Sequence, residues 1–172
     1  CVEIAKKYGV ELLVCSSLNR NSGTMVREKT KMEKMLISGV AADKNVAKIR
    51  VAGLGNDPES TFRLLNLLDR NNLNIDVMIQ SLGKDGTKSV SFTVAKPDML
   101  PTIDVLNDNK DSLGIKKLDY DENVAKVSVI GAGVRSHSGV AAKMFGALAN
   151  AGINTEMVTT SEIRITALID EA

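Results

Sequence analysis

NVAKIRVAGLG (residues 45–55) returns as NVAKVSVIGAG (residues 123–133), an internal repeat with an offset of 78 residues. After a two-residue insertion the match continues, and residues 73–78 correspond to residues 153–158. A shared period of this length indicates two copies of one supersecondary unit, because the units that stack into solenoids are typically about 20–45 residues long.

Copy one (residues 45–119) has the pattern of a strand–helix–strand–strand–helix–strand unit. Its strands alternate apolar and polar side chains, two prolines stand in first helical turns, and Asp85-Gly86 is a strong hairpin signal. Gly53 and Gly55 are expected to end the first strand. The order is the ferredoxin-like one. The predicted elements are strand 46–52, helix 58–71, strand 74–82, strand 89–95, a helix beginning at Pro97, and strand 115–118.

Copy two (residues 120–172) repeats this pattern but stops one helix and one strand short. Residues 37–41 are the only spare strand-like segment, so they are the candidate to complete it. The sequence therefore predicts an α+β protein with two ferredoxin-like βαββαβ domains, the second truncated. The predicted elements of copy two are strand 124–130, helix 138–151, strand 154–159 and strand 162–169.

Residues 1–26 follow a different pattern. They indicate the last turns of a helix ended by Gly9, followed by an apolar run at residues 10–17. Such a run is typical of a strand buried on both faces of a parallel sheet, so we expect the end of a larger α/β fold. Residues 27–35 are charged and indicate a linker or exposed helix. A solvated connector is favoured over a basic binding patch, because two glutamates dilute the positive charge.

The composition excludes several classes of function. A net charge of +1 gives no electrostatic footprint for nucleic acid or an anionic membrane, and no apolar run approaches the ~20 residues of a membrane span. A ferredoxin-like nucleic-acid binder would need exposed aromatic side chains on its sheet, and only Phe92 lies in a confidently predicted strand. The cysteines Cys1 and Cys15 fit the reducing cytoplasm better than a disulfide scaffold.

Two motifs resemble sites of chemistry, and both are incomplete. Gly131-Ala132-Gly133 follows a strand as a dinucleotide-binding turn would, but Ser136 stands where a third glycine is needed. His137 is the single histidine. It lacks a neighbouring nucleophile, an orienting acid or further metal ligands, so a hydrogen-bonded loop residue is favoured. We predict no catalytic residue and no metal site.

Each copy does offer a place for a small zwitterion. The loops at residues 55–61 and 133–140 each lead into a helix, whose first N–H groups attract a carboxylate. A polar pair starts the strand after each helix, Asn74 with Asp76 and Asn154 with Glu156. These acceptors could hold the ammonium group of an amino acid. The alternative is that the asparagines only end a helix, and spacing alone does not separate the two interpretations.

The chain resembles the C-terminal part of aspartate kinases. The resemblance lies in ELLVCSSLNRNSGTMV, ISGVAADKNVAKI, NIDVMIQS and KVSVIGAGVRSHSGVAAKMFGALANAGINTEMVTTSEIRITALID. It implies the end of an amino-acid-kinase domain followed by paired ACT domains. The implied boundaries are 1–26 for the kinase remnant, 27–44 for the linker and first strand, 45–119 for ACT domain 1 and 120–172 for ACT domain 2.

The resemblance also implies a function. Members of the family phosphorylate L-aspartate with MgATP on the route to lysine, threonine and methionine. The family's phosphate-binding motifs are not in this sequence, so the chain itself is expected to have no kinase activity and no cofactor. Its implied partners are an upstream kinase domain, a second copy of the chain paired through ACT domains, and lysine and/or threonine bound at their interfaces. The alternative is a stand-alone ACT subunit for amino-acid binding or dimerisation.

Two departures from the family pattern concern the effector loops. Glu59 replaces the usual Gly in copy one, and its carboxylate would repel that of a ligand. Asn56 replaces the usual Asp, whereas copy two keeps Gly139 and has Ser138 in place of a Pro. Copy two is therefore expected to have the better binding loop. The carried-over effector residues are Asn56, Asp57, Glu59, Thr61, Asn74, Ile75, Asp76 and Gln80 in copy one, and Ser136, His137, Gly139, Val140, Asn154, Thr155, Thr160, Ser161 and Glu162 in copy two.

Overall fold

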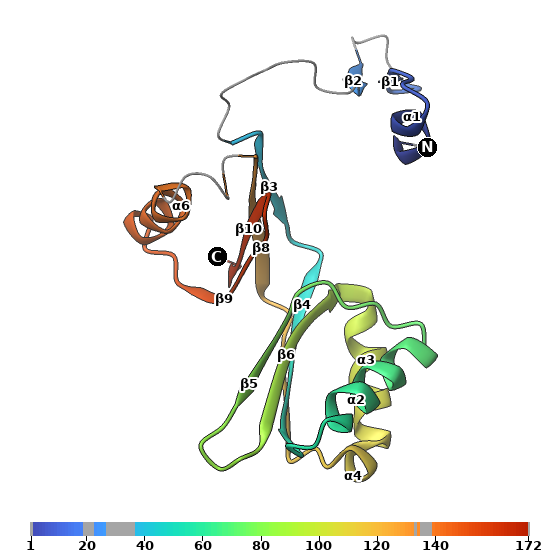
Figure 1. The fold of residues 1–172 in the computed structure, drawn as a ribbon, viewed down its shortest axis with the longest axis vertical. Coiled ribbons are helices and arrows are strands. Elements are labelled where there is room, and N and C mark those ends of the chain that lie inside the picture. The colour runs from blue at the N-terminus through green and yellow to red at the C-terminus, as the bar shows by residue number, and fades with distance from the viewer. Residues whose placement is uncertain (1, 19–22, 27–36, 133, 135–138, 172) are drawn as a thin grey trace. The chain divides into compact units, whose positions relative to one another are not determined.

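The computed structural model describes residues 2–18, 23–26, 37–132, 134 and 139–171 of the chain (Figure 1). It divides into two compact units, Cys1–Met35 and Leu36–Ala172. The predicted linker at residues 27–35 lies outside the described residues.

The first unit contains helix α1 (Val2–Lys7) and strands β1 (Leu12–Val14) and β2 (Thr24–Val26). Gly9 follows the helix with φ +64°, as the sequence predicts for a terminating glycine. The prediction of a strand buried in a parallel sheet is wrong. β1 pairs antiparallel with β2, and Leu13 and Val14 stay more than half exposed, because nothing in the described part of this unit covers them.

Copy one forms an antiparallel sheet in the order β5-β6-β4-β7, with its helices on one face (Figure 1). This is the ferredoxin-like order, and it confirms the predicted α+β class. The elements are β4 (Val46–Leu54), α2 (Glu59–Arg70), β5 (Met78–Leu82), β6 (Lys88–Ala95), the 3₁₀ helix η1 (Lys96–Asp98), α3 (Met99–Asp108), α4 (Lys110–Leu113) and β7 (Lys117–Asp121).

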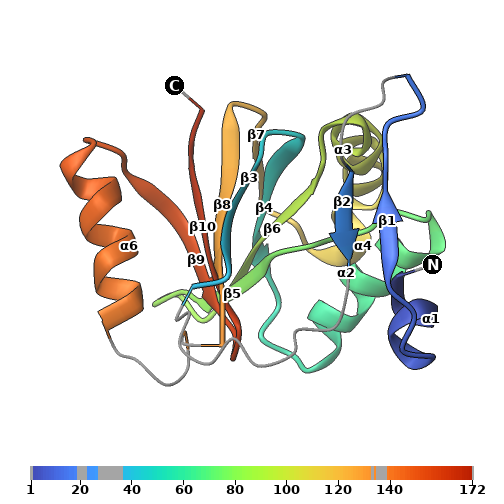
Figure 2. The ribbon, with the colours of Figure 1, turned by 90° about the horizontal axis from the view of Figure 1, so that it is seen from above.

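Copy two forms a second antiparallel sheet in the order β3-β8-β10-β9, with α6 packed on one face (Figure 2). Its edge strand β3 (Gly39–Asp43) precedes copy one in the chain and pairs with β8. β3 therefore has the edge position that β7 has in copy one. The other elements are β8 (Val124–Ile130), α6 (Gly139–Asn150), β9 (Thr155–Thr160) and β10 (Arg164–Asp170).

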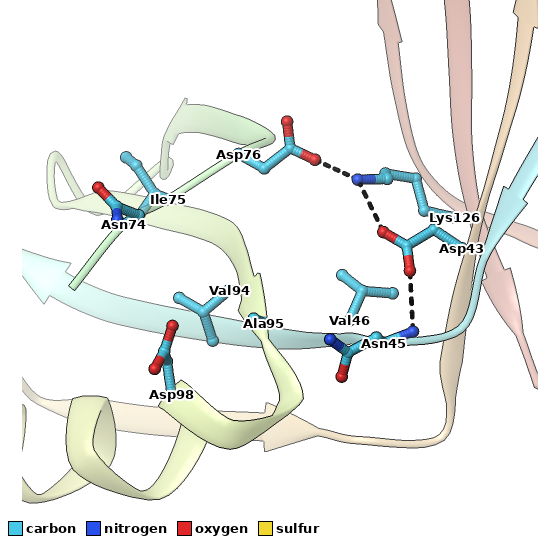
Figure 3. Close-up of a pocket in the computed structure, with 10 residues that line it drawn as sticks. All are labelled: Asp43, Asn45, Val46, Asn74, Ile75, Asp76, Val94, Ala95, Asp98 and Lys126. Atoms are coloured by element: carbon cyan, nitrogen blue, oxygen red, sulfur yellow. Dashed lines mark hydrogen bonds and ion pairs between the residues drawn. The ribbon is translucent and has the colours of Figure 1, made fainter. Parts of the chain in front are cut away.

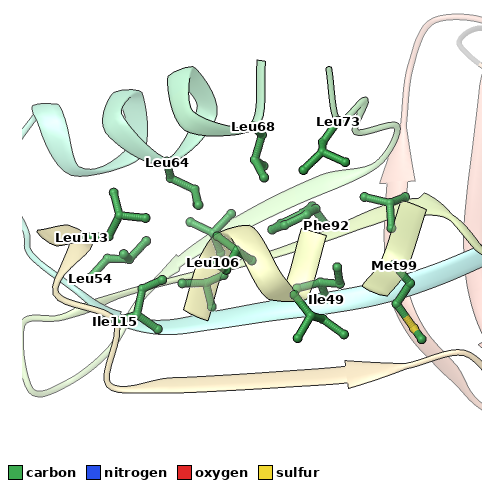
Figure 4. Packing of buried hydrophobic residues seen from close by; sticks show 14 of the residues in the cluster. Ile49, Leu54, Leu64, Leu68, Leu73, Phe92, Met99, Leu106, Leu113 and Ile115 are labelled. Carbon is green, nitrogen blue, oxygen red and sulfur yellow. The ribbon is translucent and has the colours of Figure 1, made fainter. Parts of the chain in front are cut away.

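The two sheets bury unequal cores. In copy one, α2, α3 and α4 enclose a large cluster around Phe92, Leu64 and Leu106 (Figure 4). In copy two, α6 contributes Val140 and Met144 to a smaller cluster with Val129 and Ile165. None of the described helices is long and apolar enough to cross a membrane.

Several strand boundaries differ from the sequence prediction by a few residues, and two of these differences have a clear local cause. β4 does not end at Gly53 but continues to Leu54, because Gly53 adopts φ +89° and the pairing with β6 shifts there as a bulge. The predicted strand 74–82 begins only at Met78. Before it, the N–H of Asp76 donates to the carbonyl of Thr93 at 3.0 Å and the N–H of Thr93 to the carbonyl of Val77 at 2.9 Å, while the N–H of Val77 donates to the hydroxyl of Thr93 at 3.0 Å, so the pairing with β6 is irregular there.

Candidate functional site

Repeat-equivalent residues build the contact between the two copies. Val46 and Val124 occupy the same place in their copies, as do Val77 and Met157. All four are buried in one shared cluster, which Leu168 completes. Each copy thus presents the same positions to the other, which is the pattern of an approximate two-fold contact.

Two ion pairs between the copies show the same reciprocity. Lys126 of copy two contacts Asp76 of copy one, and Lys48 of copy one contacts Glu156 of copy two. The lysines are repeat equivalents, and the two acids are equivalents as well. The side chain of Lys126 is 18% exposed and that of Lys48 is 22% exposed, so water screens both pairs only partly.

The edge strands β3 and β7 each place an aspartate beside one of these two lysines. Asp43 is paired with Lys126 across β3 and β8, and Asp121 is paired with Lys48 across β7 and β4. In the turn after each edge strand, the aspartate carboxylate accepts the backbone N–H two residues later, at 2.9 Å for Asn45 and 2.8 Å for Asn123. Asp43 also lies 3.3 Å from the ammonium of Lys126.

A pocket of about 340 Å³ lies beside one of these ion pairs (Figure 3). Three carboxylates and one ammonium group line it, those of Asp43, Asp76, Asp98 and Lys126. Lys126 bridges two of the carboxylates, while Asp98 makes no side-chain bond within the described residues. The remaining lining residues are Asn45, Val46, Asn74, Ile75, Val94 and Ala95.

The charged groups in the pocket stabilise one another's ionised forms. Burial alone would lower the pKa of Lys126, but the hydrogen bonds and negative charges of Asp76 and Asp43 outweigh it, so this pKa lies above its ordinary value. The pKa of Asp43 is lowered, first by the N–H of Asn45 and then by Lys126. Among the described residues, no group of three or more His, Cys, Asp or Glu side chains is arranged to hold a metal ion.

The loop before α2 forms a second polar cluster in copy one. The Asp57 carboxylate accepts the N–H of Glu59 at 3.0 Å, and its carbonyl accepts the ammonium of Lys88 at 2.7 Å. The hydroxyl of Thr61 donates to the amide oxygen of Gln80 at 2.7 Å. Asn56 and Glu59 are exposed.

The predicted copy-one residues thus fall into two groups. Asn74, Ile75 and Asp76 line the pocket, and none of residues 56–61 does. α2, with 12 residues, separates the two groups by about 18 Å. Asp76 is also held by Lys126, so its carboxylate is not free for the ammonium of a ligand.

In copy two, several predicted residues lie at one end of the sheet. The N–H of Gly131, where the loop to α6 begins, donates to the carbonyl of Ile163 in the β9–β10 turn, at 2.9 Å. Ser161 in that turn donates its N–H to the carbonyl of Arg164 at 2.7 Å. This turn also contains Glu162 and follows Thr160, both exposed.

The other copy-two predictions vary in exposure. Gly139 begins α6 and is exposed, whereas the side chain of Val140 is buried in the core, so only its backbone could face a ligand. Asn154 and Thr155 are exposed at the start of β9. Ser136 and His137 lie outside the described residues.

Sequence reasoning missed three lysines of these clusters. Lys48 and Lys126 carried a signal, because they recur at one position of the NVAK repeat. Lys88 carried none, since its contact with Asp57 joins positions 31 residues apart.

The comparisons with known proteins agree on a family. The model of the ACT domain matches residues 127–172. The aspartokinase of Pseudomonas aeruginosa is 37% identical over 173 residues, covering 99% of this chain and 42% of the relative. This chain therefore spans less than half the length of that relative.

Solved structures give a closer match in length. A crystal structure of aspartokinase alpha and beta subunits is 43% identical, with a TM-score of 0.72, over 78% of this chain and 88% of that one. The ligand-free regulatory subunit of aspartate kinase from Thermus thermophilus is 31% identical, with a TM-score of 0.74, over 79% and 89%. The chain therefore belongs to the aspartate kinase family, and its repeat copies are ACT domains of that family's regulatory region.

Proposed function

We propose that this chain senses lysine and/or threonine and thereby controls a kinase domain that phosphorylates L-aspartate with MgATP. That domain belongs to the same protein, residues 1–26 are its C-terminal end, and residues 45–119 and 120–172 are the two ACT domains. The protein acts in the cytoplasm as a homodimer paired through its ACT domains.

The contact between the copies carries this proposal. An effector controls a distant site only if its binding energy differs between two states of the protein, and such coupling is typically worth about 1–3 kcal/mol. The shared apolar cluster and the reciprocal pairs of Lys126 and Lys48 join the copies. A ligand that shifts one copy must therefore act on the other as well.

The chemistry of copy two suits the head group of an amino acid. The first N–H groups of α6 attract a carboxylate, and no acidic residue stands in its first turn. Oxygen atoms of Thr160 and of the β9–β10 turn, beside Gly131 where the loop to α6 begins, are acceptors for an ammonium group, whereas Asn154 and Thr155 lie at the other end of α6. Lysine and threonine share this head group and differ only in the side chain that the site must hold.

A second candidate function is a separate regulatory subunit that binds amino acids or dimerises without a kinase domain in its own chain. The similarity to the Thermus thermophilus regulatory subunit, which covers most of this chain and nearly all of that one, favours it. The two candidates differ in what a ligand does to kinase activity.

A thermal-shift screen of the twenty amino acids tests amino-acid binding, which the two candidate functions have in common. We expect lysine or threonine at about 100 times its Kd to stabilise the chain by about 2.7 kcal/mol, a rise in Tm of several degrees. If lysine, threonine and methionine all leave Tm unchanged, the sensing function is wrong.

The kinase activity of the complete protein separates the two candidates. In the first, the stabilising amino acid changes the rate of aspartate phosphorylation. In the second, it stabilises the chain but changes no kinase activity encoded in the same polypeptide.

A further inference from the structure

We infer that the Asp85–Gly86 peptide bond is a site of spontaneous isoaspartate formation, and that the folded β5–β6 turn suppresses this reaction through Thr87. The inference concerns a covalent modification of the chain and is independent of the proposed function. Asp85-Gly86 is the only place in the sequence where an aspartate or asparagine precedes a glycine. Both residues are exposed at the end of the hairpin, so water reaches them.

The reaction needs only groups of the chain and water. The backbone nitrogen of Gly86 attacks Cγ of the protonated Asp85 carboxyl group, so that an N–Cγ bond forms and the Cγ–OH bond breaks. The hydroxyl group leaves with the amide proton as water, and a cyclic succinimide remains. Water then adds to either ring carbonyl. Cleavage of the N–Cγ bond restores aspartate, whereas cleavage between the nitrogen and the α-carbonyl carbon gives isoaspartate, whose main chain runs through Cβ and Cγ.

The Asp85 carboxylate is bound to other groups of the turn. It accepts the N–H of Thr87 at 3.1 Å, and the hydroxyl of Thr87 donates to its two oxygens at 2.9 and 3.0 Å. One of these oxygens lies over Gly83, within 2.5 Å of where a Cβ would stand there. The bonds from Thr87 lower the pKa of Asp85, so its carboxyl group is rarely in the protonated form that reacts.

The attacking nitrogen is bound as well. The N–H of Gly86 donates to the carbonyl of Gly83 at 3.0 Å, and the N–H of Gly83 donates to the carbonyl of Thr87 at 2.8 Å. Gly86 has φ +76°, as in a three-residue hairpin loop that ends with a left-handed glycine. Attack requires the two reacting atoms in aligned contact, about 3–3.5 Å apart. The turn must therefore give up bonds of both Asp85 and Gly86 before it can react.

An isoaspartate would not fit this turn. Its extra main-chain carbon lengthens the connection between Leu82 and Lys88, the residues that close the pairing of β5 with β6. The same hairpin brings Gln80 beside Thr61 and Lys88 beside Asp57. We therefore expect the modification to loosen the polar cluster before α2.

Ageing of the full chain tests the inference. The wild type is incubated at neutral pH, once folded and once unfolded in guanidinium chloride. Peptide mapping by liquid chromatography and mass spectrometry then locates isoaspartate, since it separates isomers of equal mass. In the unfolded chain we expect faster reaction at Asp85 than at Asp111, which precedes Ser112, because a glycine nitrogen is the less hindered. In the folded chain we expect reaction at Asp85 to be at least about tenfold slower than in the unfolded chain, because the turn must first open.

Two variants separate the role of Thr87 from that of the turn as a whole. Thr87→Val keeps the backbone N–H and the branched shape but removes the hydroxyl, so the folded chain should react about three to ten times faster than the wild type. Thr87→Ser keeps the hydroxyl and should stay within about twofold of the wild type. In guanidinium chloride all three chains should react alike, and circular dichroism verifies that the variants fold.

Three results would overturn the inference. The first is an unfolded wild type that forms no isoaspartate at Asp85, and the second is a folded wild type that reacts as fast as the unfolded chain. The third is a folded Thr87→Val that reacts as slowly as the wild type, which would remove Thr87 as the protecting residue. None of these results bears on amino-acid sensing.

Discussion

Copy one and copy two share a repeat and a strand order, but they differ in how much they bury. Fifteen side chains form the buried cluster of copy one and seven form that of copy two, counted over the described residues. Three helices, α2, α3 and α4, cover the sheet of copy one, whereas α6 is the one helix described for copy two. Copy one therefore contributes more of the stability of the pair.

The N-termini of α2 and α6 differ too, and it is the start of α2 whose polar groups are bonded within the chain. At the start of α2 the Asp57 carboxylate accepts the N–H of Glu59 and the Asp57 carbonyl accepts Lys88 and Ser60, whereas α6 begins with Gly139 and has no acidic residue in its first turn. A loop whose polar groups are satisfied by the chain stabilises the fold and binds little. On the proposed function, copy one is mainly the stable part of the pair and copy two is the sensor.

Matched truncations in the two cores test the first half of this comparison and should have the largest effect. Leu64 and Met144 are repeat equivalents on α2 and α6, 0% and 8% exposed. We expect Leu64→Ala to lower the free energy of unfolding by about 3–4 kcal/mol and Met144→Ala by about 2 kcal/mol, because the smaller core loses fewer contacts. Urea denaturation measures both. An equal or larger loss in Met144→Ala would refute the difference in core strength.

Exchanging the charge at the helix N-termini tests the second half. Gly139→Glu should lower the affinity for the effector about tenfold, which corresponds to about 1.4 kcal/mol, whereas Glu59→Gly should change it less than about twofold. A Cβ added at Gly139 would meet no atom of the described residues within 4 Å, and a glutamate there should leave the stability of α6 unchanged or higher. Calorimetry and thermal denaturation measure the two effects separately. An unchanged affinity in Gly139→Glu would remove copy two as the sensor.

The repeat and the apolar alternation predicted most of the fold, because each strand needs one buried face. Ala47, Ile49 and Val51 alternate in the sequence and are all fully buried in β4. The pattern could not show that Gly53 is a bulge within β4, since a glycine that ends a strand and one that bends it look alike.

The polar contacts were less predictable. Lys88 and Asp57 come together only because β6 returns beside α2, so no local pattern reports their bond. Residues Asn74–Asp76 were expected beside the loop at Asp57, but the length of α2 places them at its other end. The buried strand predicted at residues 10–17 failed for a related reason, because burial depends on neighbours that a local pattern does not specify.

Removing the reciprocal lysines tests whether the contact between the copies is as symmetric as the repeat suggests. We expect Lys126→Met to lower the free energy of unfolding by about 1 kcal/mol and Lys48→Met by about half of that, because Lys126 has two carboxylate partners in the structure. Double-mutant cycles with Asp76→Asn and Glu156→Gln give the two coupling energies. Coupling energies of zero in both cycles would show that the apolar cluster alone holds the copies together.

The pH dependence of stability gives the smallest effect and separates the partners of Lys126. Its pKa is raised in the folded state, so its pairing stabilises the protein below the ordinary lysine pKa and is lost as the pH rises through the folded value. The pKa of Asp43 is lowered, so its contribution is present above the ordinary aspartate pKa and is lost as the pH falls through the folded value.

Lys126→Met should therefore remove part of the alkaline loss of stability. It should keep most of the acid loss, because the N–H of Asn45 is the first cause of the lowered pKa of Asp43. Asp43→Asn should show the converse, a smaller acid loss with an alkaline loss that largely remains, since Asp76 still holds Lys126. Asp85 and Glu171, whose pKa values are lowered by Thr87 and Lys96, contribute the same acid background to both variants. Urea denaturation from acid to alkaline pH measures these profiles. Identical profiles for the two variants would mean that the pairing of Asp43 with Lys126 does not contribute to folding.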